Sequence, residues 1–340
     1  MIKKIFIGFL LLLLILVAWN WELVVYGARQ GYGQVSLVWK ARPIKEYLDD
    51  PAFPDSLKSK LLLIGEIRRY AIDSLGLKDT QNYQTLYDQR GEEIMWVVQA
   101  CAPFELKAKL WHFPIVGSMP YKGFFQKQKA IDEGIKLEQA GNDVSIRNPG
   151  GWSTLGWFTD PILSGMLDRN EGDLASLIIH EMVHATVFVK DDVDFNENLA
   201  SFIGDTAAYY FLAAHFGRNS PQFIQYVHED QDYRKFSKHI LRGTHLLDSL
   251  YQSFSPSDSV GFKKEKKETM IAEIMNSVDT LSLFTPRKSS NPRRLPNNTY
   301  FMSYNLYQSR QGNFKSELDL DFNGDLKKYI KHLTEKYPFL

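Results

Sequence analysis

The residues with the clearest chemical meaning are His180-Glu181-Met182-Val183-His184, which form an H-E-x-x-H motif. A spacing of four places the two imidazoles on one face of a helix, about 40° apart around its axis. Two nitrogen ligands on one face suit Zn²⁺, and the glutamate between them can reach a metal-bound water. The motif therefore predicts a zinc site in which His180 and His184 are ligands and Glu181 is the general base.

The residues around the motif favour this interpretation over a purely structural one. Apolar residues recur at helical spacing through the segment: Leu174, Leu177, Ile178, Met182, Ala185 and Val189. A mostly buried helix carries two imidazoles and a carboxylate only at a cost in free energy unless these groups have partners. The alternative is a helix with two satisfied core histidines and a solvated glutamate.

A catalytic zinc site needs a third protein ligand and one open position. The third histidine of the metzincin pattern is absent, because position 190 is a lysine. The next acidic residues are Asp191, Asp192, Asp194 and Glu197. We predict Glu197, because a second helix that returns beside the first can aim it at the metal, as in gluzincins. The aspartates are better explained as loop and N-cap residues, with Asp194 placed to cap the second helix, and they remain the alternative ligands.

Hydrolysis of a peptide bond also needs a donor that stabilises the developing oxyanion. Tyr304 and Tyr121 are the candidates, with His245 as a further one, although each of them taken alone is better explained by a structural role. Asp205 lies two turns after Glu197 and is expected either to orient a ligand histidine or to have a capping or surface role.

Composition narrows the class of protein. The chain has 340 residues, of which 44% are apolar and 24% charged, so it is long and apolar enough to fold around a core. Its 40 basic and 40 acidic residues cancel, whereas a nucleic-acid-binding protein normally has a basic excess. A single cysteine, Cys101, excludes an intrachain disulfide and a cysteine-based zinc site.

The N-terminus predicts export. Lys3 and Lys4 precede residues 5–19, which carry no charge. This layout indicates a secretory signal or a membrane anchor within residues 1–26. We favour an uncleaved anchor in the cytoplasmic membrane with the rest of the chain outside. A cleaved signal, which would leave a secreted or periplasmic protein, and a buried core helix are the alternatives.

Residues 27–340 are expected to form one domain, with a sheet-containing part over 27–172 and a helical part over 173–340. Periodicity predicts helices over 54–77 and 124–140, and over 174–216 with a break at residues 191–192. Strands are predicted over 95–102, 106–113, 144–146 and 153–159, and residues 32–44 are read as an entry segment that turns at Pro43. The fold class is thus α+β and mostly helical, with a small sheet beside the H-E-x-x-H helix.

Several motifs along the exported chain together resemble the bacterial family of predicted aminopeptidases. They are Gly33-Gln34, Pro43-Ile44, residues 113–117, Pro120 to Phe125, Ser153 to Pro161, the H-E-x-x-H motif, Phe195 to Ala200 and Asn297-Asn298. The resemblance implies a zincin-like fold, a zinc ion held by His180, His184 and Glu197, and a peptide substrate. Many members of this family carry a lipoprotein cysteine at the N-terminus, which this chain lacks.

We therefore predict a zinc-dependent aminopeptidase that hydrolyses peptide bonds outside the cytoplasmic membrane and binds no nucleic acid. A zinc endopeptidase is one alternative, because the G-x-M-E-N signature that holds a free amine in one large aminopeptidase family is absent. A non-catalytic zinc-containing binding module is the other. The intact Glu181 argues against it, since a purely structural zinc site has no need of a general base.

Overall fold

The computed structural model describes residues 2–113, 117–151, 154, 159–286 and 295–337. The helices are α1 (Ile2–Trp19), α2 (Trp21–Lys40), α3 (Ile44–Asp49), α4 (Asp55–Asp73), α5 (Lys127–Gln139), α6 (Glu171–His184), α7 (Val193–His215), α8 (Pro221–Gln252), α9 (Val260–Asn276), α10 (Asn298–Gln308), α11 (Gln311–Phe322) and α12 (Leu326–Lys336). Short 3₁₀ helices cover Ser164–Asp168 and Ser277–Thr280. The α+β class with a mostly helical chain is confirmed.

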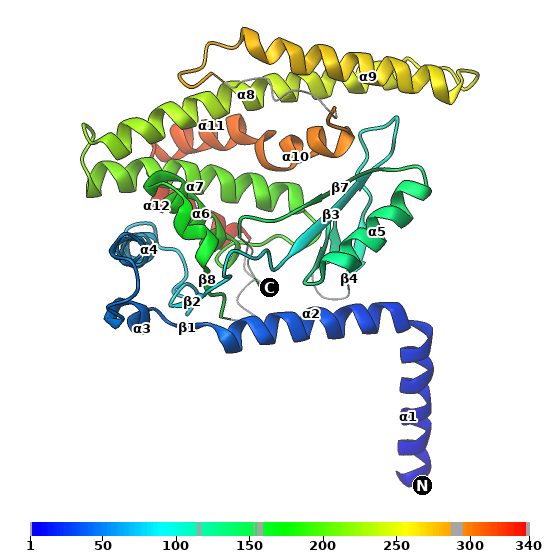
Figure 1. The fold of residues 1–340 in the computed structure, drawn as a ribbon, viewed down its shortest axis with the longest axis horizontal. Helices are drawn as coiled ribbons and strands as arrows, with labels where there is room; N and C mark the ends of the chain where they lie inside the picture. Colours follow the sequence, from blue (N-terminus) through cyan, green and yellow to red (C-terminus); the bar gives the residue numbers. More distant parts are fainter. Residues whose placement is uncertain (1, 114–116, 152–153, 155–158, 287–294, 338–340) are drawn as a thin grey trace.

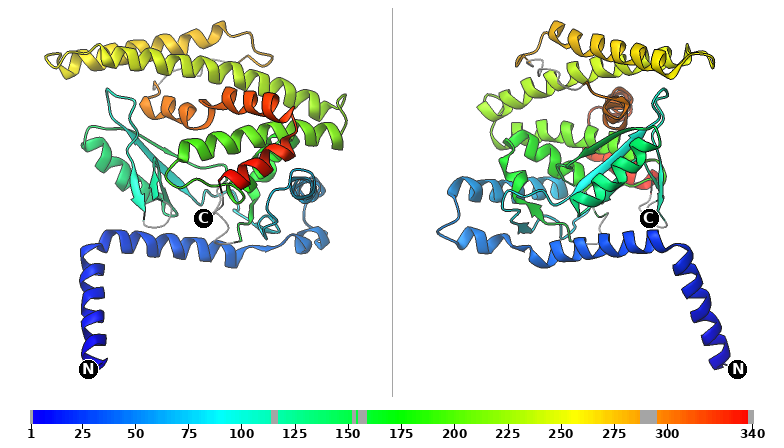
Figure 2. Two further views of the ribbon diagram at one scale, coloured as in Figure 1. Left: turned by 180° about the vertical axis from the view of Figure 1, so that it is seen from behind. Right: turned by 45° about the vertical axis from the view of Figure 1, so that its right-hand side comes forward.

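The strands form three small sheets. They are β1 (Arg42–Pro43), β2 (Thr85–Tyr87), β3 (Trp96–Cys101), β4 (Trp111–Phe113), β5 (Gly117–Met119), β6 (Lys122–Phe124), β7 (Asp143–Arg147) and β8 (Ile162–Leu163). In the sheet of order β6-β3-β7 both pairs are antiparallel, and β4 and β5 form an antiparallel hairpin. In the sheet of order β1-β2-β8, β2 is antiparallel to β1 and parallel to β8. Figures 1 and 2 show α5 against the β6-β3-β7 sheet, with α6 and α7 beside the sheet and the long helices α8 and α9 above it.

The H-E-x-x-H helix α6 lies in the middle of the largest apolar cluster. Leu174, Ile178 and Ile179 are fully buried there. The helix begins at Asn170, whose side chain accepts a hydrogen bond from the backbone N–H of Asp173 and so caps the first turn. The next helix, α7, is capped in the same way by Asp192, whose carboxylate accepts from the N–H of Phe195. The expectation that Asp194 caps this helix is wrong.

Further helices cover the central pair of helices, α6 and α7. The long α8 packs against α9 and α10, and a second apolar cluster between them includes Phe236, Ile240, Ile271 and Phe301. In Figure 1 this layer lies on the far side of α7 from α2. The predicted helices over 54–77 and 124–140 and the break within 174–216 are confirmed, as are the strands at 95–102 and 144–146.

Three expectations need correction or comment. The strand predicted over 106–113 is confined to β4, because residues 102–110 form a turn and irregular backbone. Residues 32–40 are not an entry segment but the second half of α2, and the turn comes at residues 41–43. Most of residues 153–159, predicted as an edge strand, lie outside the described residues.

In the part of the chain that the structure describes, no helix is both long enough and apolar enough to cross a membrane.

A glycine sets the distance between α6 and α7. A Cβ atom added at Gly204 would lie 2.7 Å from the backbone oxygen of Ser176 and 3.2 Å from the Cβ of His180. Backbone atoms cannot move aside as a flexible side chain can, so any larger residue at position 204 must push the two helices apart. The close contact that brings Glu197 toward the histidines therefore depends on Gly204.

We expect Gly204→Ala to destabilise the fold by about 1–3 kcal/mol, because the added methyl group overpacks the α6–α7 contact. Gly65→Ala is the matched control, since Gly65 also lies inside a helix but has nothing within 4 Å of the added Cβ. That control should be neutral or stabilising by up to about 1 kcal/mol, through helix propensity alone. Chemical denaturation of both variants measures the difference. Equal stability of the two would contradict the close-contact argument.

Candidate metal centre

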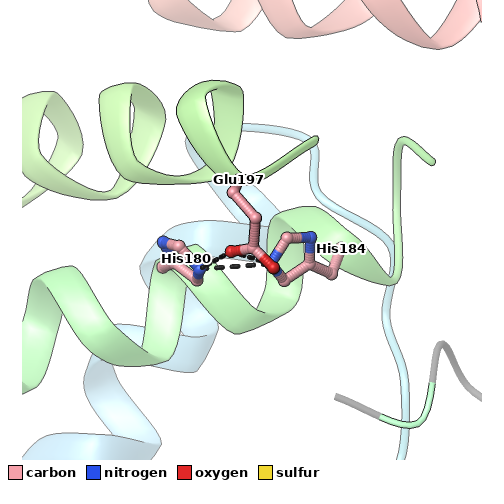
Figure 3. A group of neighbouring side chains, drawn as sticks. All are labelled: His180, His184 and Glu197. Carbon is pink, nitrogen blue, oxygen red and sulfur yellow. Dashed lines mark hydrogen bonds and ion pairs between the residues drawn. The ribbon is translucent and has the colours of Figure 1, made fainter. Parts of the chain in front are cut away.

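Three side chains from two helices point at one another (Figure 3). His180 and His184 lie one turn apart on α6, and Glu197 reaches them from the first turns of α7. Nε2 of His180 and Nε2 of His184 are 3.1 Å apart, and Oε2 of Glu197 is 3.4 Å from each of them. In the described part of the chain this is the group of metal-ligating side chains whose donor atoms converge, all within 4.8 Å of one another.

The separations fit a metal centre. Two ligands bound to zinc at about 2.1 Å in a tetrahedral arrangement are separated by about 3.4 Å. The three measured separations lie within a few tenths of an ångström of that value. Two imidazole nitrogens and one carboxylate oxygen also form a donor set that leaves the fourth position of a catalytic zinc open. The residues present therefore fit Zn²⁺.

The electrostatics keep Glu197 ionised. Burial by itself would raise the pKa of this carboxyl group, but the two facing histidines outweigh it and hold the pKa well below its ordinary value. Burial would lower the pKa of His184, but the Glu197 and Glu181 carboxylates raise it. The site is thus a place where positive charge is favoured, as a cation site requires.

Glu181 faces the same site and has an unsatisfied oxygen. Its side chain is 5% exposed, and its buried Oε2 has no hydrogen-bond partner among the described residues. Burial raises its pKa. A buried carboxylate oxygen without a partner costs free energy, so its persistence indicates a ligand or a water that completes the site.

Two tyrosines lie beside the converging side chains. The hydroxyl of Tyr121, a predicted oxyanion donor, donates to Oε1 of Glu197 at 3.3 Å. Tyr307 was not predicted; its ring lies 6.5 Å from that of His180, and its hydroxyl accepts a hydrogen bond from Arg147 Nη2. Burial raises the pKa of Tyr307, so its hydroxyl keeps its proton. It lies one helical turn after Tyr304 on α10, so the sequence pointed to the correct helix but not to this residue.

The other predicted candidates lie elsewhere. Tyr304 packs against Phe236 and Tyr300 in the second apolar cluster and does not line the cleft beside the histidines. His245 is exposed on α8 and also lies outside that cleft. Asp205 accepts a hydrogen bond from Ser176 Oγ at 2.7 Å. The polar side chain beside Nδ1 of His180 is instead that of Ser201, one turn after Glu197. Its Oγ lies 3.5 Å from that nitrogen.

The three aspartates before Glu197 have structural roles or face solvent. Asp191 accepts from the N–H of Ser118, and Asp192 caps α7. Asp194 is exposed at the start of α7. None of them belongs to the group of converging donors formed by His180, His184 and Glu197.

The site opens into a large cleft of about 1120 Å³. Leu177 of α6 and Phe188 form part of one wall, and Val97 and Gly123 of the β6-β3-β7 sheet form another. Five further carboxylates line the same cleft: Asp173, Asp205, Glu229, Asp230 and Asp232. Among the described lining residues, Arg147 and Arg169 are the basic ones, so carboxylates outnumber them and the described part of the lining has an acidic character.

Comparison with known proteins supports an assignment at the level of the family. No curated protein and no solved structure matches the chain. The family described as "putative aminopeptidase" matches residues 25–336, which include all of the converging side chains and almost all of the cleft. The chain therefore belongs to the putative aminopeptidase family.

Proposed function

We propose that this protein is a zinc-dependent aminopeptidase that acts outside the cytoplasmic membrane. The observation that carries the proposal is the convergence of Nε2 of His180, Nε2 of His184 and Oε2 of Glu197 beside Oε2 of Glu181, which has no hydrogen-bond partner among the described residues. The family supports a peptidase, and the two lysines before the apolar N-terminal run support export.

Each residue of the site has a distinct role in this proposal. His180, His184 and Glu197 hold the ion, and Tyr121 keeps the Glu197 carboxylate in place. When bound, Zn²⁺ supplies the Lewis acidity that activates a water and polarises the scissile carbonyl. Glu181 accepts a proton from the attacking water and passes it to the leaving amine. Tyr307, a protonated hydroxyl beside His180, donates a hydrogen bond to the carbonyl oxygen as negative charge develops there.

Two features favour an aminopeptidase over an endopeptidase. The first is the family itself. The second is the acidic lining of the cleft, because an aminopeptidase must bind the protonated amine at the start of its substrate. Asp173 and Glu229 lie close enough for the Glu229 charge to raise the pKa of Asp173, after the larger effect of burial. A protonated amine between such carboxylates would relieve their repulsion.

The first prediction of this proposal separates the ligands from the base. Glu181→Gln keeps the size of the side chain but removes the proton acceptor, so it should retain about one zinc per chain and lose hydrolysis on the order of a hundredfold or more. Glu197→Gln removes a charged ligand and His184→Ala removes an imidazole, so both should weaken zinc binding itself. Metal content of the purified full chain and peptide hydrolysis are measured on the same samples.

Lys315→Gln is a matched control, because Lys315 forms an exposed ion pair with Asp319 on α11. It should change neither zinc content nor hydrolysis. If Glu181→Gln lost zinc while Glu197→Gln kept both zinc and activity, the two glutamates would have the opposite roles.

A second prediction distinguishes the exopeptidase from the endopeptidase. A peptide with a free amino terminus should lose its first residue, and the same peptide acetylated at that amine should resist, because acetylation removes the positive charge that the carboxylates bind. Mass spectrometry of the products checks both. Cleavage of the two peptides at the same internal bond would establish an endopeptidase and leave the zinc proposal intact.

A third prediction compares two tyrosines on one helix. Tyr307→Phe should lower kcat on the order of a hundredfold without loss of zinc, because one donor to the developing oxyanion is removed. Tyr304→Phe should behave like the unmodified protein, since Tyr304 packs in the second apolar cluster. A loss of kcat in Tyr304→Phe with none in Tyr307→Phe would reverse this assignment.

A further inference from the structure

The helix α2 has an apolar face that points away from the rest of the protein. Six residues spaced by three or four form it: Trp21, Val24, Ala28, Tyr32, Val35 and Trp39. At 100° per residue they fall within about 40° of one line along the helix. All are exposed, up to 79% for Tyr32 and 85% for Trp39. We call these six residues the α2 stripe.

The opposite face of α2 is fixed to the body of the protein. Leu37 is buried there, and the hydroxyl of Tyr26 and the amide of Gln30 both donate to the backbone oxygen of Gly123. Gly33 lies so close to Phe125 that an added Cβ would be 2.3 Å from the ring. The helix cannot turn over to bury its stripe without breaking these contacts. The exposure of the stripe is therefore a fixed property of the fold.

The direction of α1 shows what lies on that side. The chain bends at Asn20, between α1 and α2. Figures 1 and 2 show α1 leaving the end of α2 on the side opposite the body. Its first turns expose Ile2, Ile5 and Phe6, and its last residue, Trp19, is 85% exposed. The α2 stripe is thus continuous with a second exposed apolar helix.

We propose that the α2 stripe lies on a lipid bilayer, with α2 parallel to the membrane surface. Tryptophan stands at both ends of the stripe and tyrosine near its middle, and these side chains favour the boundary between headgroups and acyl chains. The stripe contains no charge. One flank of it exposes Arg29 and Lys40, which can reach lipid phosphates, together with Glu22 near the junction with α1. A helix that lies in the interface in this way needs no spanning length.

A second copy of the chain is the alternative occupant, since two stripes could pair as in a coiled coil. The continuity with α1 favours lipid. A partner chain on α2 would still leave the apolar turns of α1 in water, whereas a bilayer covers both helices. The interfacial position also holds the body and its metal-binding cleft against the membrane, independently of whether the site hydrolyses peptides.

The test measures the depth of one residue of the stripe. In the full chain, Val35→Cys is labelled with an environment-sensitive fluorophore, and the protein is bound to vesicles of phosphatidylcholine and phosphatidylglycerol with brominated acyl chains. We expect the fluorescence to fall roughly twofold or more relative to vesicles without bromine, because an interfacial helix places its apolar face at the level of the first acyl carbons. Cys101 should not interfere, because it is buried and burial raises its pKa to about 12.

Leu320→Cys is the matched control, because Leu320 is also apolar, helical and 80% exposed, but lies on α11. Its label should not be quenched. Absence of quenching at Val35 in protein that sediments with the vesicles would overturn the proposal, because α1 alone would then hold the chain. Crosslinking between Val35→Cys copies without quenching would instead identify a second copy as the occupant.

Discussion

The structure around the site depends on one interaction, the approach of the Glu197 carboxylate to two histidines that belong to another helix. Oε2 lies 3.4 Å from both Nε2 atoms, and all three side chains are more than four-fifths buried. An ionised carboxylate in such a place is costly unless positive charge faces it. The contact therefore requires that α6 and α7 touch closely at Gly204, that Tyr121 hold the second carboxylate oxygen, and that the chain between the helices be short.

Residues that lie far from the histidines in sequence help to hold the elements around the site in place. Asp160 is 2% exposed and accepts hydrogen bonds from Gln34, Asn82 and Thr154, so one buried carboxylate joins α2 and the loop before β2 to the edge of the cleft. Asn298, the first residue of α10, joins distant segments in a similar way: its side-chain amide donates to the carbonyl of Ala102, and its backbone N–H donates to Asp143. Gln34, Asp160 and Asn298 belong to motifs that carry the family resemblance, and each of them connects separate parts of the scaffold.

The sequence predicted the helices α6 and α7 well because their signals are local. The spacing of His180 and His184, the apolar periodicity of α6 and the break near residue 191 each follow from a few neighbouring residues. The identity of the tyrosine beside His180 does not, since both Tyr304 and Tyr307 lie on α10 and only the rotation of that helix against α7 decides which one faces the cleft. The helix α2 was missed for a related reason. Its apolar stripe faces outward, and the polar Gln34 is buried next to Leu37, so the helix lacks the simple division into an apolar core face and a polar outer face by which a helix in a globular protein is recognised.

The helices α6 and α2 differ in what their apolar faces contact. An apolar helix face is favourable where it contacts something other than water. In α6 that contact is with the core of the protein, and the apolar burial offsets the cost of burying Glu181 and the two histidines. In α2 the side that faces the body carries Gln30 and Gln34 together with the buried Leu37, and the α2 stripe is left exposed. The same rule of burial that identifies α6 as a core helix supports the proposed contact between the α2 stripe and lipid. Because Gln34 also bonds Asp160, whose carboxylate accepts from Thr154 at the cleft wall, the surface that carries the stripe and the wall of the cleft belong to one hydrogen-bonded unit.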